Sequence, residues 1–336
     1  MSGRTVVVTG GTGFVGSHLV TRLMARGDET TVFDAAPPAP PAPPAGPGSP
    51  ADRPARYVRG DVRDITQLAK VITTGVDVVY HLAAVVGVDQ YLARPLDVID
   101  VNVTGTRNVL ELATRAGARV VLASTSEIFG KNPEVPWRED GDRVLGPTTA
   151  DRWAYSSSKA LSEHMTFAFG HQRGLAATIV RYFNVYGPRQ RPAYAISRSV
   201  HRVLNGLAPV VYDQGRQTRC FTYVDDVVDG TLLAGTMPGA VGEVFNIGSS
   251  EETTIGAAVS LVASLADFHS PLLRTDTAET LGAIYEDLPR RVPDTAKASS
   301  LLGLECATTL RDGLIKTIDW ARANPWWLAL PDSGAV

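Results

Sequence analysis

The stretch VVVTGGTGFVGSHL, residues 6–19, decides the fold. A run of β-branched residues leads into several glycines, and apolar residues at helical spacing follow. Gly10 permits the tight turn, Gly13 lets the backbone approach a pyrophosphate, and Gly16 lets the helix pack on the strand. Because the N-terminus of that helix would face the phosphates, the stretch predicts a dinucleotide-binding site.

The rest of the chain continues this alternation of strand and helix. Strand patterns recur at residues 30–34, 56–61, 76–83, 119–125 and 176–187, and helical patterns occur at 14–27, 65–73, 95–117 and 155–174. Strands that alternate with helices, and that lack alternating polar residues, predict a parallel sheet covered on both faces. We therefore expect an α/β protein with a Rossmann-type doubly wound parallel sheet.

After residue 187 the pattern loosens, and short strands mix with helices and many Pro and Gly. We expect residues 1–186 to form the dinucleotide-binding Rossmann domain. Residues 187–330 would form mainly a smaller mixed α/β substrate-binding region, with some strands and helices returning to the first domain. The tract of residues 35–56 is rich in Pro, Ala and Gly, which predicts an extended, exposed insertion within the first domain.

The composition narrows the classes of partner. The chain has 336 residues, of which 44% are hydrophobic and 20% charged, so it can bury a sizeable core. A net charge of −3 gives no reason to expect binding to nucleic acid or to a membrane surface. The only cysteines, Cys220 and Cys306, argue against a disulfide framework or a cysteine-based zinc site, and we predict no metal. Without a signal-peptide pattern or a long apolar run, we expect a soluble cytoplasmic protein.

Asp34 ends the second strand pattern. A carboxylate there can accept hydrogen bonds from an adenosine ribose and would repel a 2′-phosphate, which favours NAD over NADP. The alternative role of Asp34 is a helix cap or a solvated turn residue. Asp61 and Val62, after the third strand, could meet the adenine. We interpret His81, in YHLAA, as a residue packed beside the cofactor and not as a proton carrier.

A tyrosine and a lysine four residues apart mark the expected chemistry. Tyr155 and Lys159, in YSSSK, would lie on one face of the helix predicted at 155–174. The lysine ammonium would stabilise a phenolate and lower the pKa of Tyr155 toward neutrality. Tyr155 could then remove a proton from an alcohol while a hydride passes to NAD.

Together these motifs resemble the extended short-chain dehydrogenases/reductases, in the branch that modifies nucleotide sugars. The resemblance runs through TGGTGFVGSHL, GDVRD, HLAA, NVTGT, STSEIFG, YSSSK, RYFNVYGPRQ and GRQTRCFTYVDD, nearly the whole chain. It implies a tightly held NAD, a UDP- or TDP-sugar substrate, and usually a homodimer formed through a four-helix bundle. The cofactor-binding residues predicted in this way are Gly10, Gly13, Phe14, Val15, Gly16, Asp34, Asp61, Val62, Leu82, Ala83, Ala84, Asn102, Ser124, Tyr155, Lys159 and Phe183.

The segment STSEIFG, residues 124–130, discriminates among members of this family. By resemblance, Thr125 is the third catalytic residue and Ser124 sits near the nicotinamide. The alternative for each hydroxyl is that it merely caps the end of the strand. The 4,6-dehydratases carry Asp-Glu after the Thr, so Ser126 counts against dehydration. The 4-epimerases usually have small or neutral residues in both places. Thr-Ser-Glu most resembles the UDP-glucuronate decarboxylases, where Glu127 would lie beside the sugar C5 end; a structural Glu127 is the alternative.

The substrate side departs from that resemblance at one position. The decarboxylases usually place an Arg after GPR to hold the sugar, where this chain has Tyr194, and Arg189, Arg191 and Arg198 are neighbouring substitutes. For each Arg of the substrate side, a surface salt bridge is the alternative role. The substrate-binding residues that we predict, for the sugar, the diphosphate and the base, are Ser126, Asn184, Arg191, Tyr194, Tyr212, Arg219 and Arg291.

The predicted reaction is redox-neutral, with Thr125, Tyr155, Lys159 and Glu127 as the catalytic set. Tyr155 takes the proton of the sugar 4-hydroxyl as a hydride passes to NAD. The ketone is β to the C5 carboxylate of a glucuronate, so carbon dioxide leaves, and return of the hydride gives UDP-xylose. Without that return, a UDP-4-keto-pentose is released. The alternatives are a 4-epimerase of a UDP- or TDP-hexose or uronate, a 4,6-dehydratase, and a non-catalytic NAD-binding regulator.

Overall fold

Seven parallel strands form one sheet in the order β11-β6-β5-β4-β1-β2-β3. The computed structural model describes residues 3–38, 55–275 and 288–332, and most of the insertion predicted at 35–56 lies outside them. The strands of this sheet are β1 (Thr5–Thr9), β2 (Glu29–Asp34), β3 (Arg56–Arg59), β4 (Val78–His81), β5 (Arg119–Thr125), β6 (Ala177–Tyr182) and β11 (Val244–Ile247). The strand order reverses between β1 and β4, which is where a doubly wound sheet binds its ligand.

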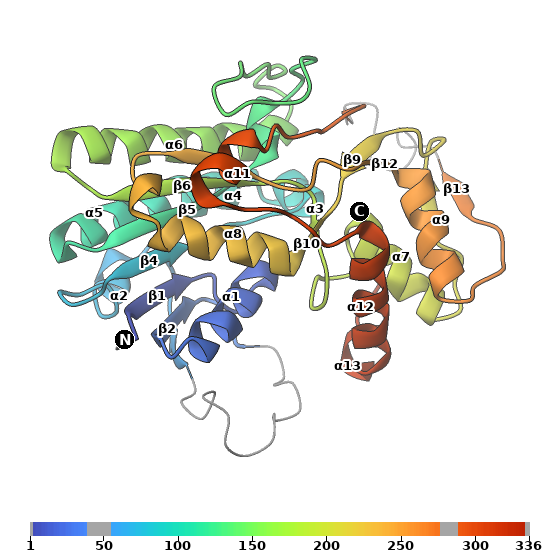
Figure 1. Ribbon diagram of the computed structural model, residues 1–336, viewed down its shortest axis with the longest axis horizontal. Helices are drawn as coiled ribbons and strands as arrows, with labels where there is room; N and C mark the ends of the chain where they lie inside the picture. The colour runs from blue at the N-terminus through green and yellow to red at the C-terminus, as the bar shows by residue number, and fades with distance from the viewer. Residues whose placement is uncertain (1–2, 39–54, 276–287, 333–336) are drawn as a thin grey trace.

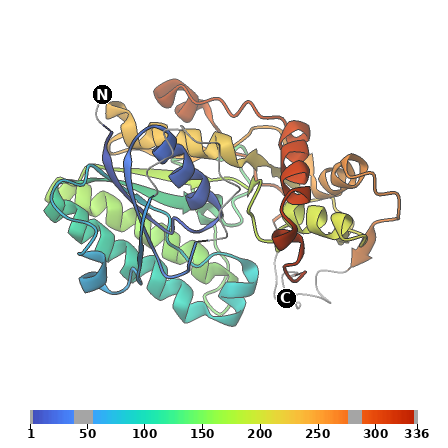
Figure 2. The same ribbon diagram turned by 90° about the horizontal axis from the view of Figure 1, so that it is seen from below.

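Successive strand residues are buried on opposite faces of this sheet. Val6 and Val8 of β1 belong to one apolar cluster, and Val7 between them belongs to another. The helices on the first face are α1 (Phe14–Ala25), α8 (Val224–Thr236) and α11 (Ala296–Leu302), and those on the second are α2 (Ile65–Leu68), α5 (Thr106–Ala116) and α6 (Arg152–Arg173). Figure 2 shows α1 and α8 on one side of the sheet and α5 and α6 on the other. The predicted Rossmann-type doubly wound fold is confirmed.

Two predicted helices differ in detail from the structure. The pattern at 95–117 is one continuous helical path made of α4 (Pro95–Asp100), a π-helical segment (Val101–Gly105) and α5, and it ends at the left-handed Gly117. The helix predicted at 65–73 is α-helical only over α2. The residues after it form turns, in which the amide of Val71 donates to the carbonyl of Leu68, three residues earlier. A short helix, α3 (Val88–Ala93), precedes α4.

The strand predicted at 176–187 is wrong as a single element. Asn184 has a φ of 39°, in the left-handed region that ends an extended strand. The chain therefore leaves the sheet after Tyr182, and the separate strand β7 (Val185–Tyr186) pairs with β10 (Thr222–Tyr223). This break places the Asn184 side chain at the edge of the sheet where the cofactor and substrate elements meet.

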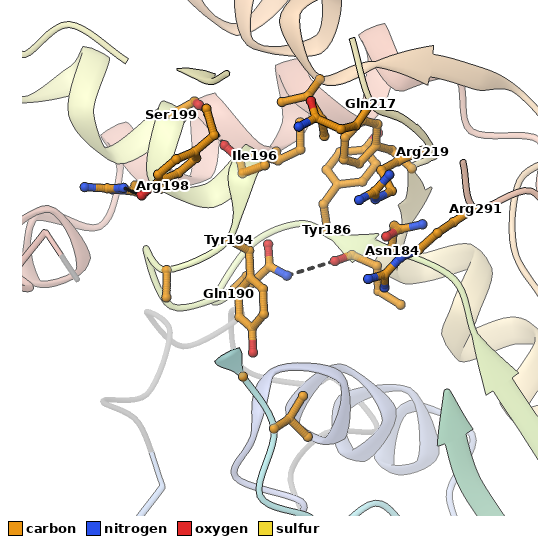
Figure 3. Close-up of a pocket in the computed structure, with 18 of the residues that line it drawn as sticks. Asn184, Tyr186, Gln190, Tyr194, Ile196, Arg198, Ser199, Gln217, Arg219 and Arg291 are labelled. Carbon is orange, nitrogen blue, oxygen red and sulfur yellow. Dashed lines mark hydrogen bonds between the residues drawn. The ribbon is translucent and has the colours of Figure 1, made fainter. Parts of the chain in front are cut away.

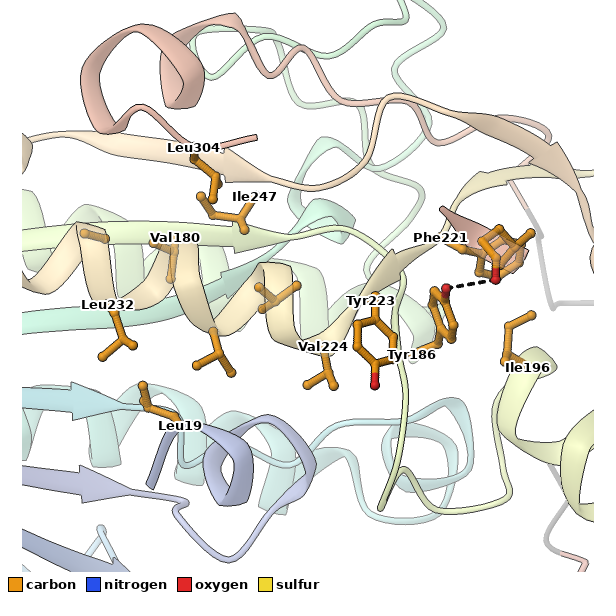
Figure 4. Packing of buried hydrophobic residues seen from close by; sticks show 14 of the residues in the cluster. Leu19, Val180, Tyr186, Ile196, Phe221, Tyr223, Val224, Leu232, Ile247 and Leu304 are labelled. Atoms are coloured by element: carbon orange, nitrogen blue, oxygen red, sulfur yellow. Dashed lines mark hydrogen bonds between the residues drawn. The ribbon is translucent and has the colours of Figure 1, made fainter. Parts of the chain in front are cut away.

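A smaller region lies beside the carboxyl ends of the strands (Figure 1). Besides β7 and β10, this region contains α7 (Ala195–Leu204), β8 (Val210–Tyr212), β9 (Thr218–Cys220), β12 (Glu252–Thr254), α9 (Ile255–Leu265), β13 (Leu273–Thr275), α12 (Leu310–Arg322) and α13 (Pro325–Leu328). One apolar cluster continues from Leu19 of α1 through Val224 to Tyr186 and Ile196, so the two parts share a core (Figure 4). Among the described residues, no helix has both the length and the apolarity needed to span a bilayer.

Candidate active site

The glycine turn between β1 and α1 is shaped for close approach. The amide of Gly10 donates to the carbonyl of Phe33 at 3.0 Å, and its φ of 72° favours glycine. A Cβ added at Gly10 would lie 2.5 Å from the backbone nitrogen of Ala83, and one at Gly16 would lie 2.2 Å from the carbonyl oxygen of Gly10. Phe14 and Val15 follow at the first turn of α1. Because these positions carry no side chain, the backbone of the turn stays open to a close approach, and this cradle fits the pyrophosphate of a dinucleotide.

Asp34 faces this turn from the end of β2. Its Oδ2 accepts a hydrogen bond from the Thr12 amide at 3.0 Å, and its Oδ1 accepts one from the Ala36 amide at 3.0 Å. Asp61, after β3, is paired with Arg63 at 2.7 Å, and hydrogen bonds from Arg63 lower the pKa of Asp61. The carboxylate of Asp34 thus lies beside the glycine turn, where it can meet a ribose.

The residues after β4 continue the same edge of the sheet. His81 is fully enclosed, with Nδ1 2.7 Å from the Thr9 hydroxyl and Nε2 3.1 Å from the Thr106 hydroxyl. Burial lowers its pKa to about 3, so its ring is neutral, and the interpretation of His81 as a packed residue is confirmed. Leu82 continues the hydrogen bonding of the strand, its amide donating to the carbonyl of Thr9 at 3.0 Å. Ala83 and Ala84 come next.

Asn102 and Val62 are buried and contact neighbouring segments at this edge of the sheet. Asn102 lies in the π-helical segment, accepts a hydrogen bond from the Val85 amide at 3.3 Å and donates to the Ser158 hydroxyl at 3.0 Å. It therefore links the loop after β4 to α6. Val62 is buried, and a Cβ added at Gly105 of the same π-helical segment would lie 2.5 Å from its Cγ2.

Tyr155 and Lys159 lie on one face of α6, as their spacing predicts. The Tyr155 ring is stacked on Tyr91, with centroids 6.4 Å apart, and Lys159 Nζ donates to the carbonyl of Ala123 at 2.8 Å. Burial lowers the pKa of Lys159 to about 8, while the charge of Glu163 raises it. Both side chains are buried beneath the end of β5.

The expectation of a lowered pKa for Tyr155 is wrong for the protein by itself. Burial raises the pKa of Tyr155, the charge of Glu127 raises it further, and a hydrogen bond with Thr125 lowers it. The ammonium of Lys159 is directed at the strand carbonyl and does not offset this burial. Activation of the phenol thus requires more than the spacing of the two residues.

Thr125 and its neighbours show how the end of β5 is built. Thr125 Oγ1 accepts a hydrogen bond from the Glu127 amide at 3.2 Å and so caps a short 3₁₀ helix, Ser126–Phe129. Ser124 donates to Glu163 at 2.5 Å, and Glu163 forms a buried ion pair with Arg181 at 2.7 Å. The hydroxyl of Ser124 therefore takes part in a structural network below the site, and its contact with the nicotinamide stays a prediction.

Glu127 meets an arginine from the distant end of the chain. Arg291 Nη1 lies 3.1 Å from Glu127 Oε1. Burial raises the pKa of Glu127, but the positive charges of Arg291, Arg152 and Arg219 outweigh that effect and hold the pKa below its ordinary value. The carboxylate is therefore ionised beside the phenol of Tyr155.

A cavity of about 280 Å³ lies against Glu127, Tyr155 and Arg291. Of the predicted residues, it is lined by Glu127, Tyr155, Asn184, Tyr194, Tyr212, Arg219 and Arg291. In Figure 3, Arg219, Arg291 and Asn184 lie on one side of this cavity, and Arg198 lies on the opposite side. The side-chain Nδ2 of Asn184 is buried with no hydrogen-bond partner within the described residues, so it is available to a ligand.

Some predicted residues lie outside the lining. Ser126 is buried, and Phe183 is fully enclosed in an aromatic cluster. Arg191 is held by Asp89 at 2.6 Å, and its guanidinium lies over the Tyr194 ring at 5.4 Å. The guanidinium of Arg191 is thus already paired, and its role in holding the sugar stays a prediction.

Sequence reasoning also missed residues that the fold brings to the site. Tyr91 and Gln190 line the cavity, and no local pattern distinguishes them. Glu163 follows Lys159 by four residues, so helical spacing could have placed it beside the lysine.

The chain is similar to known nucleotide-sugar enzymes over most of its length. The model of the NAD dependent epimerase/dehydratase family matches residues 6–248. A UDP-N-acetyl-alpha-D-glucosaminuronate decarboxylase of Bacillus cytotoxicus is 35% identical over 320 residues, covering 94% of this chain and 97% of the relative. UDP-glucuronic acid decarboxylase 1 of Danio rerio is 35% identical, covering 94% of this chain and 72% of the relative.

Solved structures of similar proteins contain the expected ligands. MoeE5 in complex with UDP-glucuronic acid and NAD has a TM-score of 0.81 and 31% identity, covering 95% of this chain and 99% of that one. UDP-glucose 4-epimerase of Thermotoga maritima, with UDP-glucose, has a TM-score of 0.84 and 27% identity, covering 96% of this chain and 99% of that one.

Proposed function

The chain belongs to the NAD dependent epimerase/dehydratase family, and from that premise we propose that it decarboxylates UDP-glucuronate to UDP-xylose, to a UDP-4-keto-pentose, or to both. The observation that carries this proposal is the pair of Glu127 and Arg291 beside Tyr155, in one cavity. A guanidinium can receive a sugar carboxylate through paired hydrogen bonds. A neutral hexose would present no group that needs it.

The chain's own residues divide the chemistry between them. NAD, when bound in the glycine cradle beside Asp34, supplies the hydride acceptor. Tyr155 removes the proton of the sugar 4-hydroxyl, and Thr125 holds the same oxygen. Lys159 provides a positive charge on the same face of α6 as Tyr155, where its ammonium donates to the carbonyl of Ala123.

Decarboxylation then follows from the structure of the oxidised sugar. The C4 ketone is β to the C5 carboxylate, so the bond between C5 and the carboxylate breaks with its electrons entering an enolate. Carbon dioxide leaves, and C5 takes up a proton. Return of the hydride to C4 and of the proton from Tyr155 to the oxygen would give UDP-xylose, and without that return the UDP-4-keto-pentose would be released. Arg291 would orient the carboxylate before departure, and the charge of Glu127 would hold Arg291 in place.

The remainder of the cavity suits the nucleotide. Arg219 is buried and donates to the carbonyls of Thr218 and Leu288 at 2.7 and 2.8 Å, which fixes a positive charge at the lining. We assign Arg219 and Asn184 to the diphosphate and Tyr212 to the base. These assignments rest on their shared position in the lining.

A 4-epimerase is the second candidate function. The similarity to the Thermotoga maritima epimerase favours it, since that enzyme shares the fold over almost the entire chain. In an epimerase the ketone would turn over and the hydride would return to its other face, and Glu127 would be peripheral. The Bacillus cytotoxicus relative adds UDP-N-acetylglucosaminuronate as a second candidate substrate for decarboxylation.

Mass spectrometry separates these reactions. The purified protein, with NAD added, is incubated separately with UDP-glucuronate, UDP-N-acetylglucosaminuronate, UDP-glucose and TDP-glucose. Loss of the mass of carbon dioxide from a uronate supports decarboxylation to the pentose, and loss of carbon dioxide together with two hydrogens supports decarboxylation with release of the 4-keto-pentose. A product of unchanged mass, resolved chromatographically from the substrate, would establish epimerisation and refute the decarboxylase proposal.

We also propose a cytoplasmic homodimer. Leu161 of α6 and Leu96 and Ile99 of α4 are exposed, and α4 packs against α6. Two copies that joined these faces would bury the three side chains in a four-helix bundle. Sedimentation of the unmodified protein as a dimer and of Leu161→Glu as a monomer would support this assembly; a monomeric unmodified protein would refute it.

A further inference from the structure

The C-terminal segment lies against the wall of the substrate cavity. Helices α12 and α13 pack beside α7, as Figure 1 shows. The indole of Trp327, which is 2% exposed, donates to the carbonyl of Gln190 at 2.9 Å. His201 of α7 lies 3.0 Å from the carbonyl oxygen of Leu328. Since Gln190 lines the cavity, this contact connects the end of the chain to the lining.

Asp332 adds a second connection through charge. Its Oδ1 accepts from Nε of Arg198 at 2.8 Å, and its other oxygen is paired with Arg202. Nη1 of Arg198 donates to the hydroxyl of Tyr212 at 2.9 Å. The side chain of Arg198 is only 17% exposed, and its bond to Asp332 fixes the orientation in which it donates to Tyr212.

Arg198 and Tyr212 both line the cavity at the end away from the reacting groups. Figure 3 places Arg198 on the opposite side from Arg291 and Asn184. Val210 and Ile255 also line the cavity, and they belong to elements that pack on one another there. Apolar side chains together with a tyrosine and a fixed guanidinium suit a planar, polar-edged base.

We propose that Asp332 is a positioning residue for nucleotide binding, which holds Arg198 and, through it, Tyr212 at the nucleobase end of the cavity. This inference rests on the proposed nucleotide-sugar function. Without the carboxylate, Arg198 loses the partner of its Nε, and the phenol of Tyr212 loses a fixed donor. The reacting groups lie at the other end, so affinity should change while chemistry at saturation does not.

Calorimetric titration with UDP tests the inference directly. Asp332→Asn is expected to raise the Kd for UDP by about tenfold, and Asp332→Glu to restore it to within about twofold. The matched control is Asp319→Asn, because Asp319 is an exposed acid of α12 that pairs only loosely with Arg322, at 3.9 Å. The control should leave the Kd unchanged.

Turnover provides the second readout. With the substrate that the unmodified enzyme converts, Asp332→Asn should raise KM by the same factor as the Kd and keep kcat within about twofold. A folded Asp332→Asn protein with unchanged Kd, or with lowered kcat and unchanged KM, would overturn the inference. If this variant does not fold, Arg198→Lys is measured in its place. The lysine keeps a positive charge for Asp332 but lacks the guanidinium nitrogen that donates to Tyr212. An unchanged Kd of Arg198→Lys for UDP would then overturn the inference. UDP binding without turnover of any tested sugar would refute the proposed function and leave this inference intact.

Discussion

Glu127 and Arg291 stand 164 positions apart in the chain and form an ion pair of 3.1 Å beside Tyr155. Glu127→Gln keeps the shape of the side chain and removes its charge. On the decarboxylase proposal we expect carbon dioxide release to slow by about 10²-fold or more, because the charge that orders Arg291 is lost. Single-turnover measurements of carbon dioxide and of NADH absorbance check this expectation.

Two variants accompany that measurement. Tyr155→Phe should abolish both signals, since no chemistry begins until the 4-hydroxyl is oxidised. Glu134→Gln changes an exposed glutamate of the neighbouring loop and should keep the full rate. If Glu127→Gln decarboxylates as fast as the unmodified protein, Glu127 has no part in the mechanism.

Asp34→Ala should relax the preference for NAD. We expect the carboxylate that lies 3.0 Å from the Thr12 amide to act both as the ribose acceptor and as the charge that repels a 2′-phosphate. Fluorescence titration with NAD and NADP measures the preference, and Glu29→Gln, at the exposed start of the same strand, is the control. Equal affinity of the unmodified protein for both cofactors would contradict the prediction.

Ser124→Ala should reduce stability and leave cofactor affinity unchanged. The substitution removes the 2.5 Å hydrogen bond to Glu163 within a buried ion pair, which costs about 1–3 kcal/mol of unfolding free energy. Chemical denaturation measures this cost, with Ser260→Ala on the exposed face of α9 as the control. A variant of normal stability that binds NAD weakly would contradict this expectation and support the predicted cofactor role of Ser124.

His81 should make the protein acid-sensitive. Its pKa is about 3 in the folded protein and 6.5 in a free side chain, so the unfolded chain binds more protons between these values. Stability therefore falls as the pH drops below 6.5 toward 3. From about pH 7.5 to about pH 5, the unmodified protein should lose about 2 kcal/mol more unfolding free energy than His81→Gln.

The control for this titration is His269→Gln, which alters a histidine that is 85% exposed. This variant should follow the unmodified protein at every pH. An identical acid loss in His81→Gln would show that other groups are responsible.

The sequence pattern correctly predicted those elements whose conformation depends on a few neighbouring residues. The glycine turn and strand β5 agree with the sequence pattern, because glycine spacing and an apolar run determine them within a few residues. The break at Asn184 was missed because its positive φ depends on the pairing of β7 with β10. The pKa of Tyr155 was predicted in the wrong direction because burial, a property of the whole fold, outweighs its spacing from Lys159.

Long-range contacts were beyond sequence reasoning. The pairing of Glu127 with Arg291 joins two segments that no periodicity relates. The same is true of Trp327 and Gln190, which lie 137 positions apart. Residue types suggested these side chains as candidates in some cases, but only the folded chain reveals their partners.

The last strand of the sheet has a practical consequence for anyone who divides this gene. Strand β11 lies against β6, although it is encoded 62 codons after the end of β6. A fragment that stops at residue 186 would expose the whole backbone edge of β6 and the apolar surface beneath α8. Such a fragment should accumulate in inclusion bodies, whereas co-expression with the remaining segment should rescue it by complementation.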